Sequence, residues 1–208
     1  MAAQNRVTPF GDIVAIDQRG LFLGNRGRIH RGRTIVRPWQ VRRWITCALR
    51  HKDWVAPRWA PGRWTALFFW DEAVALAAGH RPCALCRHGD YVRWLDAWEL
   101  GQGQRPRAEA MDRRLHDERV DGRTKRVHRL AWADVPAGGF AVEDDQAMLV
   151  QHDRLVPWSA RGYGRPRARP SGGRASMLTP PSTLDVLRHG YRPVVHPDAD
   201  PEPDPESE

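Results

Sequence analysis

Two cysteines separated by two residues have the clearest chemical meaning in this sequence. Cys83 and Cys86 form a C-x2-C motif that directly follows Pro82. This spacing lets both sulfurs reach one metal ion at a distance of about 2.3 Å. We expect the pair to lie at the start of a helix, where backbone amides and the helix dipole stabilise a thiolate over a thiol.

A second half-site lies upstream of this motif. Cys47 and His51 form a C-x3-H pair, and 31 residues separate His51 from Cys83. With three cysteines and no secretory signal, the chain favours metal ligation or buried thiols over disulfides. The sequence therefore predicts one Zn²⁺ ion bound by four residues: Cys47, His51, Cys83 and Cys86. For the fourth ligand, His80 and His88 are alternatives to His51.

The segment around the C-x2-C motif resembles the zinc-binding N-terminal domain of the Ada-type DNA-repair methyltransferases. LFFWDEAVALAAGHRPCALCR, residues 67–87, has that domain's order of an aromatic strand, an acidic helix ending in AAG, and an RPC-x2-C motif. The resemblance covers about residues 44–100. The whole chain also resembles a bacterial family of no known activity that shares the GHRPC segment.

This resemblance implies a zinc domain that binds DNA, whose first cysteine accepts a methyl group from a backbone phosphotriester. That role would fall on Cys47. The family has a C-x3-C half-site, whereas His51 stands here in place of the second cysteine. A neutral imidazole leaves the zinc centre one unit less negative and Cys47 a weaker nucleophile, so we favour a structural zinc over a methyl acceptor. Neither a helix-turn-helix segment nor a PCHR acceptor motif is found elsewhere in the sequence.

Charge points to nucleic acid. The chain has a net charge of +8, but its last 13 residues contain six acids and no Lys or Arg, so residues 1–195 carry +14. Such a body attracts phosphate backbones, although a high-GC genome also produces Arg-rich proteins of other functions. In a basic arm, the expected contacts are Arg26, Arg28, Arg31, Arg33, Arg42 and Arg43. A second, mobile segment would add Arg165, Arg167 and Arg169. An unpaired base could stack on Trp39 or Trp44.

A different function is possible at one polar cluster. Asp112 and His116 are four residues apart on an expected helix, so the carboxylate could orient the imidazole as a general base. The alternative function is therefore an enzyme acting on a modified base or nucleotide. A solvated helix face would show the same pattern.

The elements that must position these residues are mostly short. We expect a hairpin over residues 12–24, strands over 44–50 and 64–70, a helix from the N-cap Asp71 to Gly79, and further helices from near Cys83 to Leu100 and over 107–120. In the second helix, one face at helical spacing predicts core residues: Leu85, Val92, Leu95 and Trp98. Three strands over 139–158 form a small meander, a mobile segment covers 161–174, and a short helix follows Ser182.

These elements predict an α+β protein with an Ada-like zinc module. The expected divisions are an N-terminal hairpin and basic arm (1–43), the zinc module (44–100), a helix plus a small β unit (101–195) and a disordered acidic tail (196–208). No segment has the length and apolar character of a signal peptide or membrane helix, so we expect a cytoplasmic protein. The predicted function is binding of zinc and nucleic acid, DNA in preference to RNA, with a link to DNA repair. The sequence leaves the oligomeric state open.

Overall fold

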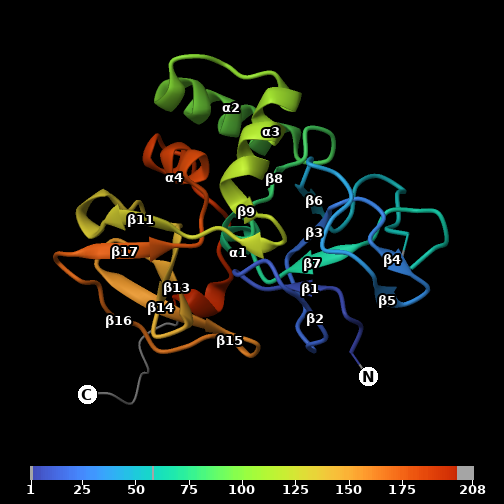
Figure 1. The fold of residues 1–208 in the computed structure, drawn as a ribbon, viewed down its shortest axis with the longest axis horizontal. Coiled ribbons are helices and arrows are strands. Elements are labelled where there is room, and N and C mark those ends of the chain that lie inside the picture. The colour runs from blue at the N-terminus through green and yellow to red at the C-terminus, as the bar shows by residue number, and fades with distance from the viewer. Residues whose placement is uncertain (1, 58, 201–208) are drawn as a thin grey trace.

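The computed structural model describes residues 2–57 and 59–200, which form a mixed α+β fold (Figure 1). Two larger β-sheets lie on either side of helix α1, and the other helices gather at the top of the view. The described part contains four α-helices and two 3-10 turns: α1 (Glu72–Ala77), α2 (His88–Gln102), α3 (Ala108–Arg119), α4 (Pro181–Arg188), η1 (Trp132–Asp134) and η2 (Pro197–Ala199). The expected α+β class is confirmed.

The first sheet holds the N-terminal strands and the segment around the cysteines. Its six strands follow the order β2 (Ile13–Val14), β1 (Arg6–Val7), β7 (Leu67–Phe69), β3 (Phe22–Asn25), β6 (Ile45–Ala48) and β8 (Arg81–Pro82). The strands expected near residues 44–50 and 64–70 are confirmed as β6 and β7. A two-stranded ribbon of β4 (His30–Arg31) and β5 (Thr34–Ile35) extends from it within the basic arm.

The hairpin expected over residues 12–24 does not form. Strand β2 pairs with β1, whereas β3 lies between β7 and β6. Gly20 permits this arrangement, because a Cβ at Gly20 would lie 1.9 Å from the carbonyl oxygen of Phe69. A residue with any side chain would hold the two segments apart, so the glycine allows close approach to β7 and not a turn between β2 and β3.

The second sheet is larger than the predicted meander. Its path is β11 (His128–Ala131), β17 (Arg174–Met177), β12 (Phe140–Glu143), β13 (Gln146–Val150), β14 (Arg154–Ser159) and β15 (Gly162–Tyr163), with β16 (Arg167–Ala168) also paired to β14. The meander is confirmed as β12, β13 and β14. The segment expected to be mobile, residues 161–174, is instead paired through β15 and β16, because its backbone finds partners along β14.

Helices α1 and α3 begin and end close to their expected bounds. The Asp71 side chain caps α1 by accepting a hydrogen bond from the Val74 amide at 2.8 Å, and Gly79 follows with a φ of +89°. Helix α2 begins at His88 and not near Cys83. Leu85 consequently lies in the preceding turn with 76 % of its surface exposed, which contradicts its expected place in the core. The buried face of α2 is formed by Trp94, Ala97 and Trp98.

The hydrophobic cores cross the expected divisions of the chain. One cluster joins Leu76, Trp94, Met111 and Met177, which come from α1, α2, α3 and β17. A second joins α1 to residues of both sheets. The first sheet also contains strands from both sides of the expected boundary at residue 43. In the described part of the chain, the module of residues 44–100 is therefore packed as part of the whole.

The start of the acidic tail is ordered, contrary to expectation. Ala199 is fully buried, and the Asp198 carboxylate accepts hydrogen bonds from Trp70 Nε1 at 3.3 Å and from the Tyr163 amide at 3.1 Å. These contacts hold η2 against the body. The rest of the expected tail, residues 201–208, lies outside the described residues. Among the helices described, none is long and apolar enough to cross a membrane.

Candidate metal centre

Strand β6 positions Cys47. Its register places Cys47 opposite Leu23 of β3, and Cys47 is 7 % exposed. On the other edge of β6, β8 runs parallel to it, and this pairing continues as a hydrogen bond from the Cys83 amide to the Thr46 carbonyl at 2.9 Å. The start of the C-x2-C motif is therefore held beside Cys47 by backbone bonds.

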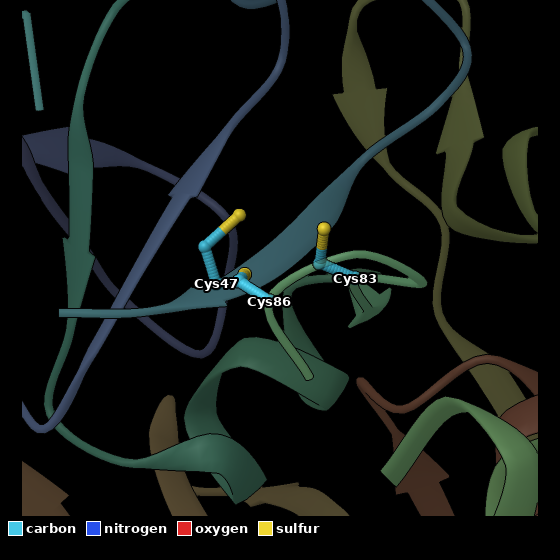
Figure 2. A group of neighbouring side chains, drawn as sticks. All are labelled: Cys47, Cys83 and Cys86. Carbon is cyan, nitrogen blue, oxygen red and sulfur yellow. The ribbon is translucent and has the colours of Figure 1, made fainter. Parts of the chain in front are cut away.

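The C-x2-C motif itself lies in the turn between β8 and α2. The Arg87 amide donates to the Cys83 carbonyl at 3.1 Å and closes this turn, and α2 starts one residue later. The motif is thus next to a helix N-terminus but outside the helix. Figure 2 shows the three side chains, one from β6 and two from the turn.

The three sulfurs lie within 4.8 Å of one another. Hydrogen bonding with Cys83 and Cys86, followed by burial, raises the pKa of Cys47, while hydrogen bonds from Cys47 and then Cys86 lower the pKa of Cys83. The opposite shifts have one cause: a thiolate at Cys83 is favoured by neighbouring thiols, and further thiolates so close to it are disfavoured. A divalent cation would remove that limit, because metal ligation requires the thiolate form.

This arrangement fits a tetrahedral metal ion. Sulfurs bound to one zinc at about 2.3 Å lie roughly 3.8 Å apart, which the present spacing reaches with small side-chain movements. The group is partly enclosed by apolar side chains that pack around it, including Leu23, Ala66 and Trp64. Three of the four predicted ligands therefore lie together, and the group can hold a metal ion.

No histidine of the described residues belongs to this group. His51 lies beyond the end of β6, in a tight turn where the Trp54 amide donates to its carbonyl at 3.1 Å. His88 is exposed and its Nδ1 lies 3.2 Å from the Ala84 carbonyl. His80 is buried away from the sulfurs and accepts from Arg26 Nε at 3.2 Å. The assignment of the fourth ligand to His51 remains a prediction.

A buried arginine connects the cysteine turn to the rest of the protein. Arg87 donates to Glu72 Oε1 and to Thr46 Oγ1, both at 2.8 Å, and its guanidinium covers the Phe22 ring at 4.4 Å. Glu72 also accepts from Tyr191 at 2.6 Å. Because these partners satisfy a charge that is otherwise costly to bury, Arg87 fixes the turn relative to β6 and α1.

Two residues predicted to contact nucleic acid are buried. Arg26 is 2 % exposed, and Trp44 is 3 % exposed with guanidinium groups of Arg26 and Arg119 each 4.0 Å from its ring centroid. Trp44 is therefore covered by arginines and cannot stack on a base. The basic, apolar-poor segment gave no indication that one arginine and one tryptophan would turn inward.

The other predicted arginines are at the surface, in two separate places. In the basic arm, Arg28, Arg31, Arg33, Arg42 and Arg43 are exposed, and Trp39 is partly buried. In the second segment, Arg165 and Arg167 are exposed, while Arg169 donates to the Val135 carbonyl at 2.8 Å. Figure 1 places β4 and β16 toward opposite ends of the long axis, so the two sets do not form one surface.

The predicted Asp112–His116 pair does not form. Asp112 accepts two hydrogen bonds from Arg81, each 2.8 Å long. His116 instead packs its ring against Trp39 and Trp44, and burial, followed by the charges of Arg119 and Arg42, lowers its pKa to about 4. The carboxylate is thus unavailable to orient the imidazole, because the buried Arg81 requires it.

The sequence did not predict several residues that the fold exposes at the surface or brings together around one cavity. Trp54 is 41 % exposed and stacks on Trp64, with ring centroids 5.6 Å apart, next to the cysteine group. Arg119 and Lys125 line the same cavity as Arg26 and Trp44. The spacing of Met111, Leu115 and Arg119 at four-residue intervals was a usable signal that Arg119 lies on the buried face of α3.

Comparison of this chain with protein-family models, with curated proteins and with solved structures found no match.

Proposed function

We propose that the chain binds one zinc ion through Cys47, Cys83 and Cys86 and binds nucleic acid, DNA in preference to RNA, through its exposed arginines. The close approach of the three sulfurs is the observation that supports the metal. Thiolate ligands select soft ions, and zinc is the one that most often holds structural sites of this kind. The ion would join β6 to the turn before α2.

The nucleic-acid part is supported by exposed, unpaired cations. Arg28, Arg31 and Arg33 lie on or beside the β4–β5 ribbon, and none of them forms an ion pair with a carboxylate of the described residues. Planar guanidinium groups suit phosphate because they donate two hydrogen bonds at once. Exposed Trp54 offers a ring for stacking in place of Trp44. The resemblance of residues 44–100 to the Ada zinc domain supports a role in DNA repair.

Elemental analysis of the purified protein tests the metal. We expect about one zinc per chain, with a marked loss in Cys83→Ser and Cys86→Ser. The same measurement on His51→Ala, His80→Ala and His88→Ala assigns the fourth ligand. His152→Ala is the matched control, because His152 is exposed in the turn between β13 and β14. A structural zinc would be contradicted if a chelator removed the zinc from the wild-type protein and the thermal midpoint stayed the same.

Salt dependence tests the nucleic-acid surface. Replacing Arg28, Arg31 and Arg33 together by Gln should weaken duplex binding and reduce the slope of log K against log salt by about 0.9 for each phosphate that is no longer neutralised. Arg105→Gln is the control, because Arg105 is already paired with Asp96 and Glu99. A slope equal to that of the control would contradict this surface, and parallel titrations with DNA and RNA of one sequence establish the preference.

A methyl-acceptor role of Cys47 is the alternative function. In that reaction the Cys47 thiolate would take a methyl group from a phosphotriester, forming a thioether and leaving a phosphodiester. We favour the structural role because Cys47 is nearly covered, which leaves its sulfur little access to a DNA backbone. Mass spectrometry after incubation with methylphosphotriester DNA distinguishes the two: a gain of one CH2 on Cys47 would establish the alternative, and an unmodified Cys47 supports the structural role.

A further inference from the structure

A cationic cavity lies away from the cysteine group. It has a volume of about 340 Å³, within the range of about 300–1,000 Å³ typical of small-molecule sites. The β9–β10 ribbon (Val120–Asp121 and Thr124–Lys125), the segment after β5 and the turn before β2 enclose it. Among the described residues, five cationic side chains and one acidic side chain line it. The cations are Arg26, Arg37, Arg119, Arg123 and Lys125, and the acid is Asp12.

The innermost cations have no counter-ion in the described part of the chain. Arg26 is 2 % and Arg119 is 1 % exposed, and Lys125 is partly buried, yet no ion pair involves any of the three. Arg26 Nη2 and Arg119 Nε are buried and donate to no acceptor among the described residues. Buried charges are ordinarily paired, because an uncompensated ion in a low-dielectric environment is strongly unfavourable.

Backbone carbonyls hold these side chains in place without neutralising them. Arg26 Nη1 donates to the Gly11 carbonyl at 2.9 Å, Arg119 Nη1 donates to the Gly79 carbonyl at 2.8 Å, and Lys125 Nζ donates to the Ala77 carbonyl. The two guanidinium groups lie over the Trp44 ring, each 4.0 Å from its centroid. The cluster is therefore held in a fixed arrangement at the cavity wall, where its positive charge can stabilise an anion.

The pKa shifts of these groups agree with uncompensated charge. Burial lowers the pKa of Arg26 to about 9 despite the opposing effect of Asp12. Burial, and then the charges of Arg26 and Arg119, lower the pKa of Lys125 well below its usual value. Both directions mean that the protein favours loss of positive charge here, and a bound anion would relieve the same repulsion.

We infer that this cavity binds the phosphate monoester group of a nucleotide, with Arg26, Arg119 and Lys125 as the groups that neutralise it. A phosphate monoester carries nearly two negative charges and three acceptor oxygens, which match three cations better than a carboxylate does. The remaining lining includes Trp39, Ile35 and Val36, which provide an aromatic and apolar wall for the rest of the ligand. Its lining includes none of the three cysteines proposed to bind zinc and none of the exposed arginines Arg28, Arg31 and Arg33. Its ligand could come from a free mononucleotide or from the 5′ end of a strand.

Calorimetric titration of the full chain with AMP, inorganic phosphate and adenosine tests the site. We expect AMP and phosphate to bind and adenosine not to bind. Lys125→Gln should weaken AMP binding about tenfold or more, as expected when one charge-assisted hydrogen bond is removed. Arg129→Gln, an exposed arginine that does not line the cavity, is the control and should bind as wild type. Absence of AMP binding, or equal binding of AMP and adenosine, overturns the inference.

A thermal measurement distinguishes binding from a structural role of the lysine. Without ligand, Lys125→Gln should keep or raise the thermal midpoint, since it removes a repelled charge, and AMP should then raise the midpoint less than in wild type. If the AMP-dependent rise is as large as in wild type, the inference is wrong, whatever the midpoint of the free variant. Arg123→Gln, at the exposed edge of the cavity, repeats both measurements if the lysine variant fails to fold.

Two single strands that differ only in a 5′-phosphate or 5′-hydroxyl identify the source. Tighter binding of the 5′-phosphorylated strand than of both the 5′-hydroxyl strand and AMP supports a strand end, whereas equal binding of the two strands together with binding of AMP supports a free nucleotide. Failure of duplex binding in the salt experiment leaves the AMP titration unaffected, so the two proposals fail independently.

Discussion

Arginine side chains in this protein occupy two environments, and the environment decides what each can bind. Arg28 and Arg31 are exposed and free of carboxylate partners among the described residues, as a phosphate-binding surface requires. Arg26 lies only two residues from Arg28 but is buried against Trp44 and His80. The same residue type therefore contributes to surface attraction in one case and to an internal cationic cluster in the other.

At the residue scale, His116 should make stability depend on pH. Its pKa in the folded state is about 4, through burial and then the charges of Arg119 and Arg42. Because this pKa lies below the unfolded value of about 6.5, the unfolded state binds more protons in between, and stability falls as pH falls through that window. Between about pH 7 and about pH 4.5, the unfolding free energy of His116→Gln should fall by about 1 kcal/mol less than that of wild type. This figure is kept small because the ring is partly exposed to solvent.

Urea unfolding at the two pH values measures this difference. His152→Gln is the control, because His152 is exposed in the turn between β13 and β14. Equal losses in wild type and His116→Gln would show that the Trp39 and Trp44 rings do not disfavour the imidazolium form.

Helix α3 is linked to strand β8 of the first sheet by a buried ion pair. Its buried face carries Met111 and Leu115, and the same face presents Asp112 to Arg81 of β8, with side chains that are 8 % and 3 % exposed. Arg81 also covers the Tyr91 ring at 5.3 Å. The element therefore fixes β8, and with it the start of the cysteine turn, through a bidentate contact and not through apolar packing alone.

At the element scale, Asp112→Ala should destabilise the protein by about 3–5 kcal/mol, because it leaves the Arg81 guanidinium buried without its partner. Glu109→Ala on the same helix should cost less than about 0.5 kcal/mol, since its pair with Arg113 is exposed and long at 3.7 Å. Chemical unfolding of both variants checks the prediction. Similar small losses in the two variants would mean that Arg81 finds another partner.

The molecule as a whole is assembled around buried polar contacts as well as apolar cores. The C-terminal residues reach back to the first sheet and to α1: Glu72 accepts from the Val194 amide and Asp71 from the His196 amide, both at 3.0 Å. Asp198 then contacts Trp70 and Tyr163. The end of the described chain thus closes the structure between the two sheets.

At the scale of the whole molecule, truncation after Val195 should destabilise the protein relative to truncation after Asp200. The shorter chain lacks the buried Ala199 and the hydrogen bonds of Asp198, each bond worth about 0.5–1.5 kcal/mol, so we expect a difference of about 2–4 kcal/mol. Thermal unfolding of the two truncated proteins measures it. Equal midpoints would show that residues 196–200 add nothing to stability, as a disordered tail from residue 196 onward would require.

Local patterns in the sequence were sufficient for features that depend on neighbouring residues. The cap and bounds of α1, the extent of α3, the β12–β14 meander and the association of Cys47 with the C-x2-C motif all follow from spacing and turn chemistry. Tertiary structure decided the rest, because pairing and burial depend on segments far apart in the chain. Gly20 allows β3 to lie close to β7, where the local pattern predicted a hairpin. Asp112 pairs with Arg81 of a distant strand and not with His116 on its own helix. Arg26, Arg119 and Lys125 line one cavity because three separate segments of the chain pack together.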